Sequence, residues 1–513
     1  MEKKSFLGFL LILLLLLLYP YYLSLFSPPQ QKKITKMREF TPTETPSSQY
    51  IEIKELKNYD TVHDTVIRNN LLEIKTSNQG GGINLIRLIR FNATLYNSDN
   101  YDKNIFFFSE PLLNYDLNKA HYTYTEQEKR IEYHLSLPGE FALEKIFALQ
   151  EDSYLLSFTL RIKNLSPQPL PVNLSLLAGE NFLPQEPWEE RYWEIVYPQA
   201  EKIRHEFFRQ IRHSQIYLAP LPWFALKNKY FVQILVPSAE NVSFALQRGA
   251  PRSLRIISQF PVTILPPEGS REENFLIYFG PLDSEVLKRY NKTWAEVVYY
   301  GMFDGIAKFI LKLLKLGFAF FKNYGLAIIF LSFLVNLFLF PFTWKSTKAM
   351  RALQNIQPQI EQLRKTYGQD VQRLNREILE LYRKHKVNPL GGCLPLFLQM
   401  PIFISLYQVL VRAIELKGAK FLWIKDLALP DALITFPRNF FFINSLNLLP
   451  LIMAGMVFLQ QKKTQVYSSS QRQTAWFMPL FLGFIFYNFP AGVVLYWLIS
   501  TGLNLCFSWR LQG

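Results

Sequence analysis

Residues 50–290 show short runs in which apolar and polar side chains alternate. Two of these runs are Arg130–Leu137 and Phe141–Leu149, and the turn sequence L-P-G at 137–139 separates them. Alternation with a period of two, bounded by turn residues, is typical of strands with one buried face. A succession of such runs predicts an all-β sandwich over residues 50–290. The glycines at 80–82 precede a strand, so we interpret them as a hairpin turn or bulge rather than a phosphate-binding loop.

Continuous apolar runs occupy the start and the last third of the chain. The predicted membrane spans are an N-terminal signal anchor at 1–27 and five later segments at 324–343, 394–411, 446–460, 475–488 and 492–507. The last two are separated by N-F-P-A-G at 488–492. As one helix this block would reach about 48 Å, well beyond a hydrocarbon core of about 30 Å. The pattern therefore predicts a polytopic α-helical membrane protein with six spans.

Charge assigns each loop to a side of the membrane. The net charge is +15, and residues 344–389 hold ten Lys or Arg against four Asp or Glu. Such an excess of basic residues marks cytoplasmic loops. No small-x-small cleavage signal follows 1–27, which favours an uncleaved anchor over a signal peptide. Both termini are then cytoplasmic, residues 28–49 form an external linker, and the sandwich lies outside the membrane.

Two charged segments show helical spacing of their apolar residues. In 303–322 the apolar side chains share one face between lysines, which predicts an amphipathic helix on the outer membrane surface. In 344–389 apolar stripes before and after Gly368 predict a cytoplasmic hairpin of two antiparallel helices, with a kink at Pro358. The positive charge of this hairpin fits contact with anionic lipid or ribosomal RNA, and it also fits an ordinary solvated helix face.

The sequence shows no motif for catalysis or metal binding. The six histidines lack metal-ligand spacing, the two cysteines lie in apolar segments, and no acid/His pair is apparent in the sandwich. We therefore expect a protein that is not an enzyme and needs no cofactor or metal. The five later spans contain polar residues but no Asp, Glu or Lys, which argues against an ion-coupled transporter. These polar residues fit either hydrogen bonds between helices or a hydrated groove.

Four ordered motifs resemble the YidC family of membrane-protein insertases. They are K-V-N-P-L-G-G-C at 386–393, Q-M-P-I-F at 399–403, L-W-I-K-D-L at 422–427 and F-P-A-G-V-V-L-Y-W at 489–497. The resemblance covers residues 300–508, and the layout of anchor, sandwich and core is similar to the Gram-negative form of the family. It implies an inner-membrane protein with a five-helix insertase core, 324–508, around a hydrophilic groove open to cytoplasm and lipid.

The resemblance also implies a function and partners. Such a groove receives hydrophobic segments of nascent membrane proteins and lowers the cost of moving their polar ends across the membrane, alone or with the Sec translocon. The ribosome and anionic lipids are further expected partners. The motifs place Asn336, Phe403, Tyr496 and Trp497 in the groove; Met453 is added from its place in the fourth span, and Gln399 and Asn504 from their polarity.

Two features depart from the family pattern. The family usually has an Arg five residues before the proline of the second span, where this chain has Asn336 before Pro341. Asn keeps hydrogen-bonding capacity but lacks the charge that would attract acidic segments, so we expect hydration and shape to attract the substrate. Arg412 lies at the outer end of the third span and is expected to be an interfacial anchor. Few residues follow Arg510, so we expect a ribosome contact through the tail to be either missing or transferred to the hairpin.

Two other classes of function fit parts of the pattern. A transporter or channel would need a continuous polar path through the spans and usually a charged relay. An acid/His pair in the sandwich would favour a membrane-tethered carbohydrate-binding or epimerase-like protein. The insertase hypothesis accounts for the spans, the hairpin and the surface helix together.

Overall fold

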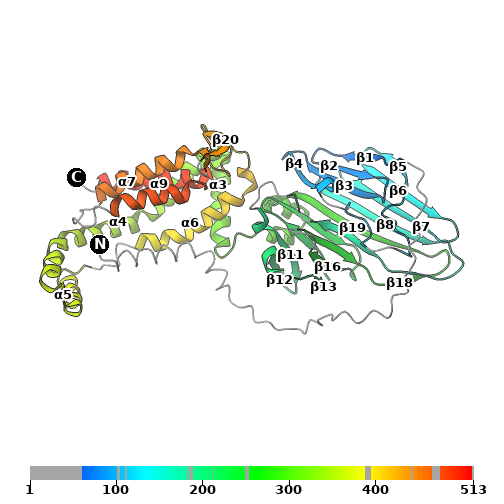
Figure 1. Ribbon diagram of the computed structural model, residues 1–513, viewed down its shortest axis with the longest axis horizontal. Helices are drawn as coiled ribbons and strands as arrows, with labels where there is room; N and C mark the ends of the chain where they lie inside the picture. The colour runs from blue at the N-terminus through cyan, green and yellow to red at the C-terminus, as the bar shows by residue number, and fades with distance from the viewer. Residues whose placement is uncertain are drawn as a thin grey trace.

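The structure of this chain is a computed structural model. It describes residues 61–100, 104–109, 112–180, 182–183, 189–211, 213–248, 253–387, 394–440, 443–464 and 474–510. The predicted signal anchor at 1–27, the linker at 28–49, and the motif residues 388–393 lie outside these ranges. The described chain has two parts, a β-rich part and a helical part, which lie at opposite ends of the molecule (Figure 1).

The β-rich part is built on a sheet of nine antiparallel strands. Its order is β12-β11-β14-β15-β19-β8-β7-β6-β5, and two four-stranded sheets, β1-β2-β3-β4 and β10-β17-β16-β13, and the pair β18-β9 accompany it. The strands are β1 Asp64–Arg68, β2 Leu72–Ser77, β3 Gly82–Leu88, β4 Ala93–Asn97, β5 Thr123–Gln127, β6 Arg130–Leu137, β7 Phe141–Leu149, β8 Leu155–Asn164, β9 Leu170–Val172, β10 Ser175–Glu180, β11 Glu194–Gln199, β12 Lys202–Phe207, β13 Gln215–Tyr217, β14 Phe224–Lys227, β15 Phe231–Pro237, β16 Ser243–Arg248, β17 Leu254–Gln259, β18 Thr263–Leu265 and β19 Ser270–Pro281.

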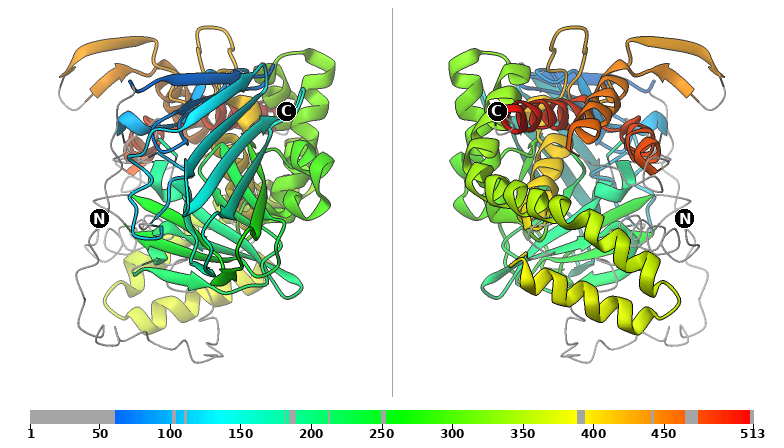
Figure 2. Two further views of the ribbon diagram at one scale, coloured as in Figure 1. Left: turned by 90° about the vertical axis from the view of Figure 1, so that its right-hand side faces the viewer. Right: turned by 90° about the vertical axis from the view of Figure 1, so that its left-hand side faces the viewer.

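The helical part follows a short connection. Its helices are α2 Ser284–Tyr290, α3 Asp304–Phe321, α4 Tyr324–Tyr367, α5 Val371–Lys384, α6 Leu394–Arg412, α7 Leu448–Thr464, α8 Thr474–Phe486 and α9 Ala491–Arg510. Short 3-10 turns lie at η1 Ser98–Asn100, η2 Glu189–Tyr192, η3 Phe208–Gln210, η4 Lys292–Val297 and η6 Ile414–Leu416. A hairpin of β20 Ile434–Phe440 and β21 Ile443–Leu446 joins α6 to α7 and extends beyond the helices (Figure 2).

The division into a β-rich domain and a helical C-terminal region confirms the coarse prediction. By length and composition, one helix among the described residues could cross a membrane alone, over Tyr324–Leu353. The other apolar helices are shorter: Leu398–Arg412, Leu448–Lys462, Phe477–Phe486 and Ala491–Phe507. The six-span arrangement therefore stays a prediction.

Helix α4 differs from the expected boundary between span and hairpin. The sequence predicted a span at 324–343 and a separate hairpin helix after it, but α4 continues as one helix from Tyr324 to Tyr367, through Pro341 and Pro358. A proline removes one backbone hydrogen bond, and packing on neighbouring turns can hold the helix together across it. The first arm of the hairpin is thus a direct extension of the membrane helix.

The triple glycine forms the predicted turn, between β2 and β3. Gly80 and Gly81 have φ of 73° and 55°, which favours glycine. Beneath this turn lies Lys145 of β7, which is fully buried and donates hydrogen bonds from Nζ to the carbonyl oxygens of Gly80 at 2.7 Å and Phe106 at 2.9 Å. Its ammonium group also lies 4.7 Å from the Phe108 ring centre. Burial lowers the pKa of Lys145 to about 7.

Lys145 gives the sandwich a stability that rises with pH. Its pKa is about 7 when folded and near 10.5 when exposed, so the unfolded chain binds more protons between these values and stability increases across that window. From pH 7 to pH 9 the gain is about 2–3 kcal/mol. We expect Lys145→Met to lose this increase of stability with pH. The measurement is thermal unfolding of the detergent-solubilised full-length protein at several pH values. If the stability of Lys145→Met rose with pH as much as that of the natural protein, a buried Lys145 with a lowered pKa would be contradicted.

Candidate functional site

Asn336 lies on the buried side of α4, facing α9. Its Nδ2 donates to Oγ of Ser500 at 2.9 Å and to the carbonyl oxygen of Ser332 at 2.7 Å. The Asn336 side chain is largely buried, and α4 and α9 pack against each other. The Asn336 amide thus takes part in a hydrogen bond between two apolar helices.

A second hydrogen bond extends this contact to α6. Nε2 of Gln399 donates to the Tyr496 hydroxyl at 2.8 Å, and the same hydroxyl interacts with the side chain of Ser500 one turn along α9. Asn336, Ser500, Tyr496 and Gln399 therefore form one connected set across α4, α9 and α6, which we call the polar network. Asn336, Ser500 and Tyr496 are buried, whereas Gln399 is half-buried.

Aromatic rings lie on the α6, α8 and α9 side of the polar network. The ring centres of Phe403 and Trp497 are 5.0 Å apart with perpendicular planes, and Phe486 of α8 lies 5.0 Å from Trp497. Phe403 and Trp497 are half-buried. The side chains thus form an apolar wall next to hydrogen-bonding groups, which suits a chain segment with an apolar body and a polar end.

The other two candidates lie apart from the network. Met453 on α7 is completely buried, so in this state its side chain faces packed helices rather than an open surface. Asn504 lies one turn beyond Ser500 on α9 and is half-buried, and no hydrogen bond among the described residues joins it to the network. The structure therefore brings together five of the seven predicted residues: Asn336, Gln399, Phe403, Tyr496 and Trp497.

The residue that sequence reasoning missed is Ser500, which links Asn336 to Tyr496. Its only signal was a serine one helical turn from Tyr496 in an apolar segment. The polar network contains amides and hydroxyls and no ionised side chain. Each of its members can donate or accept a hydrogen bond, so the network can exchange internal bonds for bonds to a polar group or water without moving a charge.

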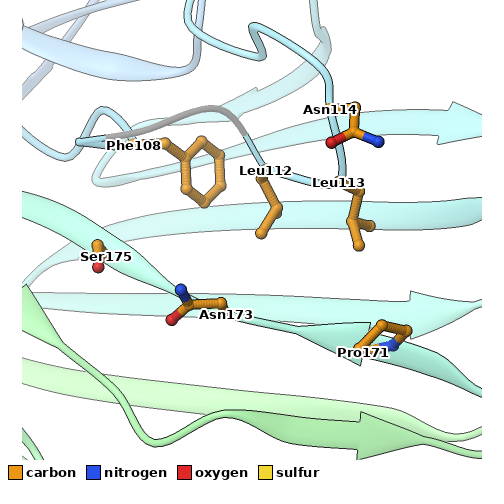
Figure 3. Close-up of a pocket in the computed structure, with 7 residues that line it drawn as sticks. All are labelled: Phe108, Leu112, Leu113, Asn114, Pro171, Asn173 and Ser175. Carbon is orange, nitrogen blue, oxygen red and sulfur yellow. The ribbon is translucent and has the colours of Figure 1, made fainter. Parts of the chain in front are cut away.

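The sandwich contains a cavity of about 250 Å³ (Figure 3). Its lining residues are Phe108, Leu112, Leu113, Asn114, Pro171, Asn173 and Ser175. These side chains offer apolar contact and a few hydrogen bonds but no acid or base. None of these seven described lining residues carries an acid or base of the kind that general acid–base catalysis uses.

The sequence-based statement that the sandwich lacks an acid/His pair was wrong. Glu132, His134 and Glu144 on β6 and β7 bring three potential ligand atoms within 4.8 Å of one another, because His134 pairs directly with Glu144 across the two strands. Arginines already bind both carboxylates: Arg130 contacts Glu132 at 2.6 Å, and Arg161 contacts Glu144. We therefore assign no metal or catalytic role to this group.

A second acid/His pair belongs to a buried ion cluster between the two parts of the chain. Glu194 accepts from Nζ of Lys227 at 2.7 Å and from Nη2 of Arg412 at 2.8 Å, and Nδ1 of His205 lies 3.3 Å from it. We call Glu194, Lys227, Arg412 and His205 the interdomain ion cluster. Burial alone would raise the pKa of Glu194, but Lys227, His205 and Arg412 hold it at about 2.

This cluster corrects the expectation for Arg412. The sequence predicted an interfacial anchor, but its side chain is 9 % exposed and paired with Glu194, more than two hundred residues away in the chain. A charge at the end of an apolar helix looks the same in sequence whether it meets lipid headgroups or a folded domain. No local pattern reveals a partner at that separation.

Two family models match the chain. The model for the YidC periplasmic domain matches residues 64–313, and the model described as 60Kd inner membrane protein matches residues 316–512. The membrane protein insertase YidC of Syntrophobacter fumaroxidans is 33% identical over 387 residues, which cover 73% of this chain and 69% of that protein. The membrane protein insertase YidC of Geotalea uraniireducens is 29% identical over 541 residues, which cover 98% of each chain.

Solved structures of two kinds are similar to this chain. A crystal structure of an active YidC insertase with its first transmembrane domain resolved matches over 90% of this chain and 95% of its own, with a TM-score of 0.39 and 19% identity. A galactose mutarotase related enzyme from Lactobacillus acidophilus matches over 42% of this chain and 97% of its own, with a TM-score of 0.34 and 11% identity.

Proposed function

Because this chain belongs to the YidC family of membrane protein insertases, we propose that its polar network is the place where the hydrophilic end of an inserting segment is received. The protein is a membrane insertase and not an enzyme. The observation that carries the proposal is the connected set of neutral hydrogen-bonding side chains on α4, α9 and α6, next to the half-buried Phe403 and Trp497. Met453 and Asn504 would line the same groove only after the helices move apart.

The physical task is to shelter polar groups during transfer. A polar group without a partner in hydrocarbon costs about 2–7 kcal/mol, depending on the reference. Asn336 and Gln399 can exchange their present bonds for bonds to the substrate or to water, so that this cost is reduced at each stage. The aromatic side chains of Phe403 and Trp497 meanwhile contact the apolar part of the segment. The segment then leaves sideways into lipid, where its apolar surface is more stable.

The remaining features of the proposal concern topology and partners. We propose six spans with both termini in the cytoplasm, the sandwich in the periplasm and the nascent membrane protein as substrate. The distal part of α4 and helix α5 project from the helical part on the end away from the sandwich (Figure 1), which supports a cytoplasmic position for them. The exposed basic residues of this hairpin supply a surface for the ribosome or anionic lipids, and the Sec translocon is a further proposed partner.

Charge at position 336 should alter substrate preference. We expect Asn336→Arg to speed the insertion of a substrate with an acidic outer segment about fivefold, because one ion pair in a partly hydrated site is worth about 1 kcal/mol. The gain should be confined to that substrate, and a neutral-tailed substrate should show no such increase. The measurement is insertion of both substrates into vesicles containing the purified protein, with leakage of a small solute followed in parallel.

Asn336→Gln is the matched control, because it changes length without adding charge. It should leave the ratio of the two insertion rates unchanged. Complete loss of insertion in Asn336→Arg contradicts the proposed role of the network. Solute flux with no insertion activity would instead support a transporter or channel.

A further inference from the structure

The outer end of α6 is held by the β-rich domain. Arg412 is the last residue of α6, and Glu194 is the first residue of β11. Glu194 is itself paired in register with Lys227, the last residue of β14. Arg412, Glu194 and Lys227 are all buried, so the contact is shielded from the solvent that weakens surface ion pairs.

The guanidinium of Arg412 makes contacts in three directions. Nη2 donates to Glu194 Oε1 at 2.8 Å, Nη1 donates to the carbonyl oxygen of Tyr299 at 3.1 Å, and the group lies 5.2 Å from the centre of the Tyr192 ring. A planar group bonded at two nitrogens and stacked on a ring has a fixed orientation, which a single ammonium cannot reproduce. Arg412 therefore fixes the position of the end of α6 along the helix axis and its rotation about that axis.

Neighbouring contacts hold the segment that follows α6. Lys315 of α3 bridges Glu415 at 2.7 Å and Asp283 at 3.3 Å. Lys417 lies 5.2 Å and 4.9 Å from the ring centres of Tyr230 and Phe231 in the sandwich. Lys315 thus links two segments next to the held end, and Lys417 reaches aromatic rings of the β-rich domain, so charged as well as apolar side chains hold this region.

Helix α6 connects this held end to the polar network. Gln399 and Phe403 lie on the same helix, about 20 Å and 14 Å from Arg412 along its axis. A change of rotation at the outer end would turn Gln399 away from Tyr496 and Phe403 away from Trp497. The polar network thus depends on how the sandwich holds Arg412.

We propose that Arg412 is a positioning residue of the insertase, which through Glu194 uses the β-rich domain to set the orientation of α6 and of its groove side chains. The proposal rests on the proposed function of the polar network. It gives the sandwich a mechanical role, in which the domain is a rigid support for one groove helix.

The experiment uses the full-length protein in lipid nanodiscs and vesicles. The variants are Arg412→Met, Arg412→Lys and, as the matched control, Lys420→Met, which removes an exposed lysine of the same outer region. Each is also made with Cys393 and Cys506 replaced by Ser and spin labels at Ile216 and Leu422, which are 49% and 75% exposed. The readouts are the distance distribution between the labels and the insertion rate of a short-tailed membrane protein.

We expect Arg412→Met to broaden the distance distribution and to slow insertion about fivefold, which corresponds to a barrier raised by about 1 kcal/mol. Arg412→Lys should restore part of the narrow distance distribution and part of the insertion rate. Lys420→Met should match the natural protein in both readouts. If Arg412→Met does not fold, the partial loss in Arg412→Lys carries the test. An unchanged insertion rate, slower insertion with an unchanged distance distribution, or an equal loss in Lys420→Met overturns the proposal.

The proposed function fails in a different way. It fails when removal of the network side chains themselves leaves insertion unchanged, whatever the Arg412 variants do. A broad distance distribution combined with normal insertion in Arg412→Met would overturn only the positioning role.

Discussion

Replacing Asn336 and Gln399 together with Leu is expected to slow insertion at least about tenfold. The double substitution removes both amides of the polar network and leaves Ser500 and Tyr496 without these partners. A hydrogen bond between membrane helices or to a substrate is worth about 1 kcal/mol, and a factor of ten in rate corresponds to about 1.4 kcal/mol. The loss of two such hydrogen bonds is therefore expected to slow insertion by more than a factor of ten. The measurement is the insertion rate of a short-tailed membrane protein into vesicles.

Thr343→Val is the matched control for this test. Its hydroxyl also lies on α4, but it donates to the carbonyl oxygen of Leu339 within the same helix at 3.1 Å. The control removes a polar group of the same helix outside the network, so insertion should remain near the natural rate. Normal insertion by Asn336→Leu, Gln399→Leu would refute the network as the receiving site, and equal losses in both proteins would show only that α4 tolerates little change.

The architecture was predictable wherever a local pattern repeats. Strand alternation indicated the β-rich domain, because each face of a strand recurs every second residue. Likewise, apolar steps of three and four in 303–322 predicted a helix, and α3 covers Asp304–Phe321. The continuous course of α4 was not predictable, because Pro341 and Pro358 lower helix propensity locally and only neighbouring packing compensates.

The candidate site was predictable in its chemistry but not in its connections. Polarity selected Asn336 and Gln399, and the family motifs selected Tyr496, but nothing in the sequence showed that Ser500 completes the link. Such a link depends on the rotation of α9 against α4 and α6. The interdomain ion cluster is the clearest case, since Glu194 and Arg412 come from different domains and neither has a local partner pattern.

The interdomain ion cluster also keeps the positive charge of Arg412 at the outer end of α6. Arg412 is a cation on one of the groove helices, but Glu194 already binds it at the outer end of α6. About 20 Å of helix separates it from Gln399. The polar network has no charged member among the residues that the structure describes, so under the proposed function its preference for a substrate comes from hydrogen bonding, hydration and shape.

Glu194→Gln should destabilise the β-rich domain by about 3–5 kcal/mol, because it leaves Lys227 and Arg412 buried without their counter-charge. In a domain of this size that loss lowers the unfolding temperature on the order of 10 °C. The measurement is thermal unfolding of the detergent-solubilised full-length protein at neutral pH. Glu272→Gln is the matched control, because its pair with Arg161 is exposed and its loss should leave the unfolding temperature nearly unchanged.

The same effect should appear on acidification. The pKa of Glu194 is about 2 in the folded protein and near 4.5 when exposed, so the unfolded chain binds the extra proton between these values. The stability that Glu194 supplies is complete above about pH 4.5 and is lost as the pH falls to 2. The stability of the natural protein should therefore fall toward that of Glu194→Gln over this pH range. A constant difference between the two proteins from pH 7 to pH 2 would show that Glu194 is not held ionised by Lys227 and Arg412.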